Sequence, residues 1–455
     1  MAPPYLPFLI FSVFFTIAGA QVPVTQTFHY TVNGTYEFKY TEYEANYRIV
    51  RNQAHSISTF PFELCFYNTT PNAFVLAIKA GIPTDDSHMR WVWDANRDHP
   101  VREKASLSLR RDGNLVLADA DGSLVWQTAT ANRGVVGLKL LPNGNLVLHD
   151  KTGRFIWQSF DHPTDTLLAG QSLRINGHDR LISRSSDSDG SNGPYGIRLD
   201  REGFNSYINV NTSGGRRKPL VYGGWRGTDF GSVITFDVVR KSRNPTEYEL
   251  VLAVNQNGSG SGGRRLLQVP PTRNENQLIL NKLNYNATYS FLRLGSDGNL
   301  RAFTYYDKAS YLRWTETFAY FSSYFVSECQ LPTRCGTFGL CERGMCVACP
   351  SPRGLLGWSD RCAPPHAGAC NGMTAAGTVD YYKIVGVDHF LSAYLPEGNG
   401  TMKVEECRER CSRDCECVGF FYEEDSSRCL LAPYLGTLIS IEGETGFVGY
   451  IKYTK

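Results

Sequence analysis

Residues 112–127 read DGNLVLADADGSLVWQ, and residues 143–158 read NGNLVLHDKTGRFIWQ. Each copy has an Asp-Gly or Asn-Gly turn, an apolar LVL run, a second turn ending in glycine and a strand-like run ending in tryptophan. Trp126 and Trp157 end the two copies, and the upstream stretch RWVWDAN places Trp93 about one repeat earlier. A unit this small cannot bury its apolar face alone. The repeat therefore predicts three hairpin-like units, each with a buried tryptophan, in a threefold all-β prism that favours binding over catalysis.

Strand-like runs continue after the repeat. They read RLISR, YGIRL, SVITFDVV, EYELVLAV, SFLRL and RAFTYYD between residues 170 and 320, where helical periodicity is absent. Residues 296–314, SDGNLRAFTYYDKASYLRW, are a looser copy of the hairpin block that ends at Trp314. This region therefore predicts a second, degenerate β domain of the same kind.

Length, charge and the N-terminus limit the class of protein. A chain of 455 residues suggests about three domains. Its net charge of +2 requires no basic face, so nucleic acid is not an expected partner. Residues 1–20 contain a short apolar run followed by Ala-Gly-Ala, the pattern of a cleaved signal peptide. No other stretch has the length of a membrane span, so we expect a secreted protein without a membrane anchor.

The cysteines agree with secretion. Of 13 cysteines, Cys65 stands alone in the apolar run FELCFYN, and the other 12 fall between Cys329 and Cys429. In an oxidising compartment such a cluster predicts disulfides rather than a zinc site. The six cysteines of 325–365 allow 15 pairings, among which the spacing does not choose. Cys65 is expected to be a buried free thiol, with an intermolecular link as the alternative.

Two further patterns concern local structure. In VEECRERCSRDCECVGFFY (404–422), Cys407 and Cys411 are four residues apart and share one face of a predicted helix, which is stapled to a small sheet. Six N-x-[ST] sequons predict glycosylation. They are Asn33, Asn68, Asn211, Asn257, Asn286 and Asn399.

Several separate blocks resemble a known family. RWVWDANRDHP, the DGNLVL repeat and WQSFDHPTDTLL resemble the bulb-type, mannose-binding lectin domain of plants, and the C-x3-C-x3-C-x-C run with Cys429 resembles a PAN/apple domain. The order of domains resembles S-locus glycoproteins and the ectodomains of S-domain receptor kinases. LCFYNTTPNAF, MRWVWDANR, GVVGLKLLPNGNLVL, ECQLPTRCGTFGLC and DHFLSAY are most similar to the epidermis-specific secreted glycoprotein-like proteins of plants, which lack a kinase and are associated with the cell wall.

The resemblance implies a mainly β chain. It consists of a signal peptide (1–20), a lead-in segment (21–60), a bulb-type lectin β-prism (45–168), a second degenerate lectin-like β-prism (169–324), a small disulfide-rich EGF-like module (325–365) and an α+β PAN/apple domain (370–454). Likeness to PAN domains implies the disulfides Cys407–Cys429 and Cys411–Cys417, which leaves Cys370 for Cys415. EGF-like spacing implies Cys329–Cys341, while the pairing of Cys335, Cys346, Cys349 and Cys362 stays open.

The family also implies where sugar binds. Bulb-type lectins bind mannose with the pattern Q-x-D-x-N-x-V-x-Y, because alternate strand residues face one way and line up polar groups for the sugar hydroxyls. The first candidate site is Arg110, Asp112, Asn114, Val116 and Ala118, which lacks the Gln and the Tyr. The second is Leu141, Asn143, Asn145, Val147 and His149, and the third is Gly295, Asp297, Asn299, Arg301 and Phe303.

No candidate site is complete. Each hydrogen bond nets about 0.5–1.5 kcal/mol, so losing two partners of five is enough to abolish weak binding. The alternative is that Asp-Gly-Asn is present because it makes the turn. Neither H-E-x-x-H nor G-x-S-x-G occurs, and we expect no enzyme activity, cofactor or metal site.

Three functions stay open at this point. The first is a secreted protein of the cell wall or apoplast that binds mannose-type or wall carbohydrate weakly or with altered specificity. The second is a protein-interaction module that pairs with extracellular receptors or with itself, as a soluble partner or decoy. The third is a structural barrier component of the wall that binds no sugar.

Overall fold

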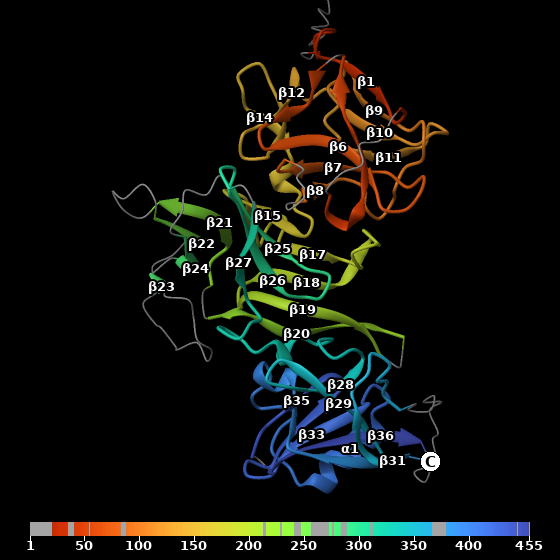
Figure 1. Ribbon diagram of the computed structural model, residues 1–455, viewed down its shortest axis with the longest axis vertical. Coiled ribbons are helices and arrows are strands. Elements are labelled where there is room, and N and C mark those ends of the chain that lie inside the picture. The colour runs from red at the N-terminus through yellow and green to blue at the C-terminus, as the bar shows by residue number, and fades with distance from the viewer. Residues whose placement is uncertain are drawn as a thin grey trace, which may run out of the picture.

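The computed structural model describes residues 21–34, 41–53, 55–82, 88–212, 215–227, 230–240, 247–255, 273–274, 277–283, 289–309, 313–365, 379–443 and 445–454. The predicted signal peptide at 1–20, the sequons at Asn257 and Asn286, and Cys370 lie outside these residues. The described chain is mostly β-strand and forms three tiers along the long axis, which run in chain order from red to blue (Figure 1). Among the described residues, no helix is long and apolar enough to cross a membrane.

The first tier, here called the first prism, is built from three antiparallel sheets of residues 28–158. The first sheet has the order β2-β6-β7-β8 (Asn46–Ile49, Phe62–Asn68, Val75–Ala80, Arg90–Asp94), with β5 (Ser58–Thr59) beside β6. The second has the order β1-β9-β10-β11 (Phe28–Thr31, Ser106–Leu109, Leu115–Ala118, Leu124–Gln127). The third is β12-β13-β14 (Gly137–Leu140, Leu146–His149, Phe155–Gln158), and β3 (Arg51–Asn52) with β4 (His55–Ser56) forms a small hairpin.

The three repeat tryptophans meet where the sheets converge. Trp93 of β8, Trp126 of β11 and Trp157 of β14 pack edge to face, with ring centroids 5.8–6.1 Å apart. Trp93 and Trp157 are buried, and Trp126 is partly exposed. Edge-to-face packing is a preferred arrangement of aromatic rings. The three-sheet prism predicted from the repeat is confirmed, and two of its three tryptophans are buried as expected, whereas Trp126 is partly exposed.

Glycines make the repeat turns. Gly113 and Gly144 have φ angles of 89° and 84°, in the left-handed region that favours glycine. Each also faces a neighbouring segment closely. A Cβ at Gly113 would lie 2.8 Å from the Cβ of Val135, and one at Gly144 would lie 2.7 Å from Cδ1 of Leu168. Conformation and close packing therefore both require glycine at these turns.

Residues 21–60 contribute strands to the first prism. β1 pairs with β9, and β2, which lies inside the predicted lectin domain at 45–168, pairs with β6, both in antiparallel register. Two strands of this segment therefore complete sheets whose other strands come from the repeat region. The sequence did not show this because the partners are about 20 to 80 residues away, and strand pattern alone does not choose a partner.

The second tier, the second prism, again has three sheets among the described residues. Their orders are β15-β25-β26-β27 (Thr166–Leu168, Tyr289–Leu294, Leu300–Tyr305, Trp314–Ala319), β16-β21-β22-β24-β23 (Ser172–Arg174, Val233–Arg240, Tyr248–Asn255, Gln277–Leu283, Arg273–Asn274) and β17-β18-β19-β20 (Arg180–Arg184, Asn192–Asp200, Gly203–Asn211, Arg217–Arg226). The predicted second β domain therefore has the same three-sheet plan as the first.

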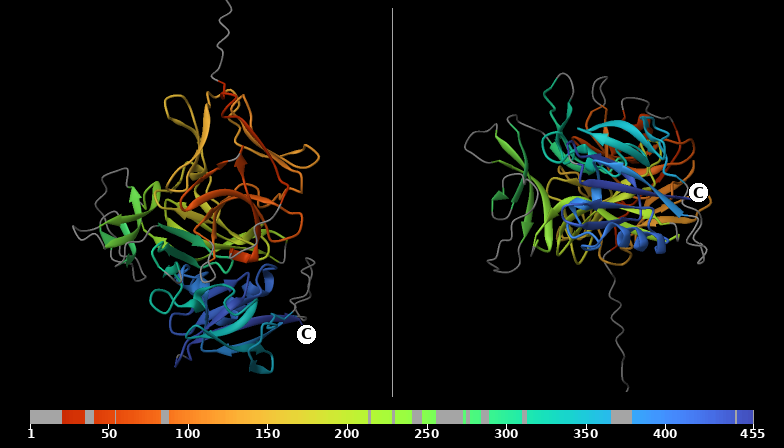
Figure 2. Two further views of the ribbon diagram at one scale, coloured as in Figure 1. Left: turned by 45° about the horizontal axis from the view of Figure 1, so that its top comes forward. Right: turned by 90° about the horizontal axis from the view of Figure 1, so that it is seen from below.

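The sheet that begins with β15 belongs to both prisms. Every residue of β25 is buried, and neighbouring residues point to opposite sides. Phe291 packs in the core of the first prism, whereas Leu292 packs in the core of the second. The two prisms are thus fused through one sheet with two buried faces, and they lie next to each other in both views of Figure 2.

A buried ionic network joins the same two prisms. Arg293 of β25 pairs with Glu42, in the 3-10 turn Glu42–Glu44, which also pairs with Arg90 at 2.7 Å. Arg97 lies 3.4 Å from Asp165 in the same junction. Burial raises the pKa of the Glu42 carboxyl, but Arg293 and Arg90 outweigh it, so that pKa lies below its usual range.

The third tier, the C-terminal unit, combines the cysteine-rich module with the PAN-like region. One sheet has the order β31-β36-β33-β34 (Val379–Val385, Phe447–Thr454, Gly419–Glu423, Arg428–Ala432), with α1 (Val404–Arg413) beside it. The other has the order β30-β29-β28-β35-β32 (Gly354–Gly357, Met345–Ser351, Phe338–Glu342, Gly436–Ser440, Val387–His389). Short 3-10 turns cover Ser159–Asp161, Glu328–Gln330 and Phe390–Ala393.

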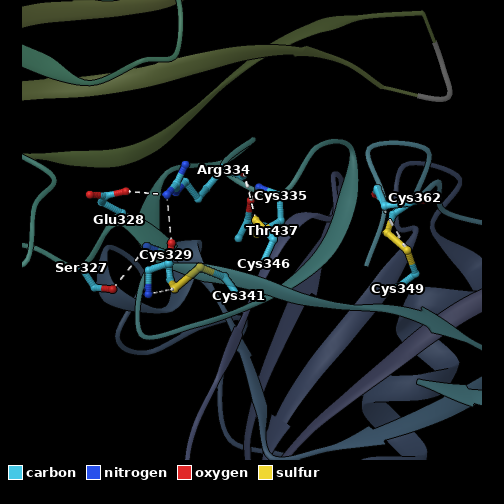
Figure 3. The surroundings of a disulfide bond; sticks show 12 residues. Ser327, Glu328, Cys329, Arg334, Cys335, Cys341, Cys346, Cys349, Cys362 and Thr437 are labelled. Atoms are coloured by element: carbon cyan, nitrogen blue, oxygen red, sulfur yellow. Dashed lines mark hydrogen bonds and ion pairs between the residues drawn. A yellow bond between two sulfur atoms is a disulfide. The ribbon is translucent and has the colours of Figure 1, made fainter. Parts of the chain in front are cut away.

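The second of these sheets fuses two regions that the sequence separates. β28 pairs in parallel with β35, so Leu340 lies opposite Leu438. Thr437 of β35 also accepts a hydrogen bond from the backbone N–H of Cys335 at 3.0 Å (Figure 3). The predicted EGF-like module at 325–365 is therefore packed into the C-terminal unit through a shared sheet, and is not an independent connector.

Disulfides fix both halves of this unit. In the cysteine-rich half the bonds are Cys329–Cys341, Cys335–Cys346 and Cys349–Cys362, the last lying apart from the other two (Figure 3). In the PAN-like half they are Cys407–Cys429 and Cys411–Cys417. Cys329–Cys341 and the two PAN-like bonds are the pairs that the resemblance implied. The predicted Cys370–Cys415 bond involves a residue outside the described part of the chain, and Cys65 is a buried free thiol.

Candidate carbohydrate-binding site

The first candidate site lies at the turn before β10. Arg110 is exposed, Asp112 is half-buried, and Asn114 and Val116 are buried. Asp112 accepts a hydrogen bond from the backbone N–H of Asn114 at 2.9 Å, which closes an Asx turn. The four residues thus lie at one turn, but the side chains of Asn114 and Val116 are buried in the protein interior.

Both the oxygen and the nitrogen of the Asn114 side-chain amide are hydrogen-bonded within the protein. Its oxygen accepts from the hydroxyl of Thr128 and from the backbone N–H of Thr130, each at 3.2 Å. Its nitrogen donates to the side-chain oxygen of Gln127 at 2.7 Å. An asparagine held in this way ties the turn to the segment that follows Trp126, and it has little capacity left for a sugar hydroxyl.

The second repeat reproduces this arrangement. Asn145 donates to Gln158 at 2.8 Å and accepts from the hydroxyl of Ser159 and the backbone N–H of Phe160, each at 3.3 Å. Asn143 accepts from the backbone N–H of Asn145 and is exposed, while Val147 is buried. The same local chemistry recurs because the repeated block carries Gln directly after Trp in both copies.

The third copy uses backbone groups for the same purpose. Asn299 donates to the carbonyl oxygen of Phe321 at 2.8 Å and accepts from its backbone N–H at 3.0 Å. Asp297 is paired with Arg301 at 2.6 Å. Burial raises the pKa of the Asp297 carboxyl, but the Arg301 guanidinium outweighs it, so that pKa lies below its usual range.

Three copies therefore share one structural motif, in which a buried asparagine staples a turn to the end of its hairpin. Sequence reasoning gave the asparagines but missed their partners. The signal that would have found them is the invariant WQ at the end of both clear repeats. At the first site, the side chains that remain exposed are those of Arg110 and Gln127.

The sequons differ in exposure. Among the described residues, Asn33, Asn211 and Asn399 are exposed. Asn68 is buried in β6, and its amide nitrogen donates to the carbonyl oxygen of Thr70 at 3.0 Å. A glycan at Asn68 conflicts with this packing, because it would occupy that nitrogen and need an exit to solvent. The structure therefore argues against the glycosylation predicted at Asn68.

Comparison with known proteins agrees with the fold. Residues 90–186 match the family model of D-mannose binding lectin, and residues 392–434 match that of the PAN-like domain. The fold and these two matches define the class: a lectin-domain protein with a PAN-like domain.

Closer relatives define the family. EP1-like glycoprotein 2 of Arabidopsis thaliana is 54% identical, and the alignment covers 96% of each chain. EP1-like glycoprotein 1 of the same plant is 52% identical over the same shares. The Epidermis-specific secreted glycoprotein EP1 of Daucus carota is 44% identical over 77% of this chain and 90% of that protein. The chain belongs to the EP1-like glycoprotein family.

More distant similarities are weaker. G-type lectin S-receptor-like serine/threonine-protein kinase SD2-5 of Arabidopsis thaliana is 25% identical over 80% of this chain, but the alignment covers 41% of the kinase. A solved structure, the two-domain fetuin-binding agglutinin of Scilla campanulata, is 14% identical over 58% of this chain and 97% of that chain, with a TM-score of 0.15, too low to support an inference. The high-identity relatives are named glycoproteins and not enzymes.

Proposed function

We propose that this chain is a secreted glycoprotein of the cell wall or apoplast that binds extracellular carbohydrate with a specificity altered from mannose. The observation that carries the proposal is the D-mannose binding lectin match at 90–186, a range that lies largely in the first prism. The name of the Daucus carota relative, which describes it as secreted, supports the location. Exposed sequons at Asn33, Asn211 and Asn399 are consistent with a glycosylated extracellular surface.

The repeat sites are expected to contribute little to this binding. At the first site, Arg110 and Ala118 stand where the mannose pattern has Gln and Tyr, and Asn114 has its amide bonded within the protein. Few hydrogen bonds remain, each worth about 0.5–1.5 kcal/mol. We infer that any sugar bound through Arg110 and Asp112 is bound more weakly than at a complete site.

A glycan array tests the proposed function. The intact, disulfide-bonded protein is compared with an Arg110→Ala/Asp112→Ala variant, in which the buried Asn114 is left in place. Signal for neutral plant-wall or mannose-type glycans supports carbohydrate binding, and a signal that the variant loses places it at the first repeat. Absence of signal from the intact protein on every glycan contradicts the proposal.

A second candidate function is protein binding, and an exposed apolar surface on β29 and β30 favours it. Met345, Val347 and Leu356 are exposed there, and strand alternation places them on one face together with Trp358, whereas the exposed Leu355 points to the other face. Contiguous exposed apolar side chains mark interaction sites more often than isolated ones do. Cross-linking of intact protein to extracellular proteins, compared with a Leu356→Ser/Trp358→Ser variant, tests this alternative. Equal capture by both forms contradicts it.

A further inference from the structure

A cleft of about 510 Å³ lies between the first and second prisms, away from the repeat turns. Its walls come from the loop after β8 (95–99), from β11, from the turn at 163–164, from the loop 177–180 and from the start of β18. These segments belong to both prisms, so the cleft exists because the prisms are fused. Its volume is in the range of ordinary small-ligand sites.

One wall of the cleft is aromatic. Trp126 lines it, is partly exposed, and is fixed from behind by edge contacts to Trp93 and Trp157. The His162 ring stacks on the Trp157 ring with their centroids 5.3 Å apart. His178, which also lines the cleft, packs edge to face on His162 with a centroid distance of 4.5 Å. A rigid, partly exposed indole offers the apolar surface on which the C–H face of a pyranose ring packs.

Polar groups along the cleft lack protein partners. Among the described residues, the indole N–H of Trp126 and the imidazoles of His99 and His178 make no hydrogen bond within the protein, and the buried hydroxyl of Thr164 has no partner. The Thr164 hydroxyl oxygen is itself fully buried, so a ligand in the cleft reaches the polar groups of Trp126, His99 and His178 and not that hydroxyl. Donors and acceptors are both present, as sugar hydroxyls require.

The cationic side chains of the cleft are, by contrast, already paired with carboxylates. Asp179 accepts from Arg180 and from Arg198, each at 2.8 Å. Asp98 accepts from the backbone N–H and the side-chain amide of Asn192. Arg97, which also lines the cleft, pairs with Asp165, so among the described lining residues both arginines are bound to carboxylates. The Asp98 carboxylate keeps its charge, which disfavours an acidic sugar. The balance of groups favours a neutral ligand rich in hydroxyls.

We propose that this cleft is a carbohydrate-binding site, separate from the repeat sites, that takes a neutral pyranose unit of a glycan. The ring packs on Trp126, and its hydroxyls bond to His178 and His99. The inference rests on the proposed function, because it names the place at which that binding occurs. None of these residues belongs to the Q-x-D-x-N-x-V-x-Y positions.

Gly177 allows the cleft to be filled without disturbing the fold. It lines the cleft, is exposed, and has no left-handed φ. A Cβ added there would lie 3.6 Å from the Cβ of Arg174, an ordinary contact. Gly177→Tyr therefore adds a bulky ring at the edge of the cleft without a steric clash. Gly357→Tyr is the matched control, since Gly357 is exposed in β30 and a Cβ there meets nothing within 4 Å.

The experiment is saturation-transfer-difference NMR on the intact glycoprotein with four probes: methyl α-mannoside, methyl β-glucoside, methyl β-galactoside and the methyl glycoside of galacturonic acid. We expect transfer to at least one neutral probe and none to the uronate. Gly177→Tyr is expected to abolish that transfer, and Gly357→Tyr to leave it unchanged. His178→Ala is expected to weaken binding by about three- to tenfold, the value of one hydrogen bond.

The outcomes distinguish the proposed carbohydrate-binding function from the proposed location of the site in the cleft. Transfer that persists in Gly177→Tyr but is lost in Arg110→Ala/Asp112→Ala overturns the cleft and leaves the proposed function standing. Stronger transfer to the uronate than to the neutral probes overturns the neutral ligand class. No transfer from the intact protein to any probe, together with a silent glycan array, overturns the proposed function and the inference with it.

Discussion

Several buried polar side chains in this protein make hydrogen bonds that the sequence pattern does not reveal. The repeat asparagines are the clearest case, because a motif typical of sugar binding is here part of the turn. Asn114 and Asn145 each make three side-chain hydrogen bonds to groups that follow the repeat tryptophan. A residue of this kind is more important for stability than for binding.

Replacing Asn114 should therefore destabilise the first prism. Asn114→Ala leaves the buried backbone N–H of Thr130 without an acceptor, and such an unsatisfied group costs about 1–3 kcal/mol. We expect the free energy of unfolding in urea to fall by about 2–3 kcal/mol. Arg110→Ala, an exposed neighbour, is the control and should change nothing measurable. Equal urea midpoints for the two variants would show that the asparagine does not hold the turn.

His389 should make the stability of the folded chain depend on pH. It is buried at the end of β32, where Nε2 faces the carbonyl oxygens of Tyr434 and Leu435, and Nδ1 accepts from the backbone N–H of Leu391. Both nitrogens are thus satisfied in the neutral ring with its proton on Nε2. Burial lowers the pKa of His389 from 6.5 to about 4.

The sign of the effect follows from the two states. Above pH 6.5 the ring is neutral in the folded and the unfolded chain, so it has no effect on stability. As the pH falls from 6.5 to about 4, only the unfolded chain takes up the proton, and the folded state loses up to about 3 kcal/mol. We expect His389→Gln to be less stable at pH 7 but to show a flatter pH profile in thermal unfolding. Parallel profiles from pH 7 to 4 would contradict this role.

At the scale of elements, the short helix depends on covalent ties. α1 is ten residues long, too short to be stable alone, and its buried positions are Cys407 and Cys411. One bond links it to β34 across 22 residues, and the other closes a loop of six. A longer closed loop restricts the unfolded chain more.

The two disulfides should therefore contribute different amounts to the free energy of unfolding. Removing Cys407–Cys429 by alanine substitution should cost about 3.5 kcal/mol, and removing Cys411–Cys417 about 2 kcal/mol, from loop-closure entropy. Differential scanning calorimetry of the two double variants measures the order of their melting temperatures. A lower melting temperature for the variant without Cys411–Cys417 would show that native packing, not loop closure, decides the ranking.

The elements also show what sequence could and could not supply. The helix at 404–413 was predictable because two cysteines four apart fix one face, and the hairpins because Asp-Gly and Asn-Gly set their turns. The parallel pairing of β28 with β35 was not, since its partners are almost 100 residues apart and apolar runs do not specify a neighbour. The cleft was out of reach for the same reason: its walls come from five separate segments, and although three of them lie in the quoted lectin-like blocks, no pattern indicates that they meet.

At the scale of the whole molecule, the two prisms are packed together through a shared sheet and a buried ionic network. Figure 2 shows them stacked with the C-terminal unit, and the buried cluster of the second prism continues into that unit through Phe338, Phe390 and Phe421. The junction between the prisms contains charges as well as apolar groups. Arg293 reaches Glu42, the carbonyl oxygen of Trp91 and the hydroxyl of Thr166.

Breaking this junction should loosen both prisms together. Arg293→Met leaves the buried Glu42 with one partner fewer, and removing one member of a buried pair costs about 3–5 kcal/mol. Adding Glu42→Gln should recover part of that loss, because the stranded charge is removed. Thermal unfolding of the two single variants and the double variant measures the coupling. Strictly additive losses would mean that the two residues do not act as a pair.

The most direct test of the account is hydrogen–deuterium exchange of the intact glycoprotein, with and without the neutral oligosaccharide that gives the strongest array signal. Exchange protection reports which backbone segments a ligand closes. The account predicts protection in the loops 95–99 and 177–180, with no change at 110–116. Protection confined to 110–116, or no change anywhere in the chain, would contradict it.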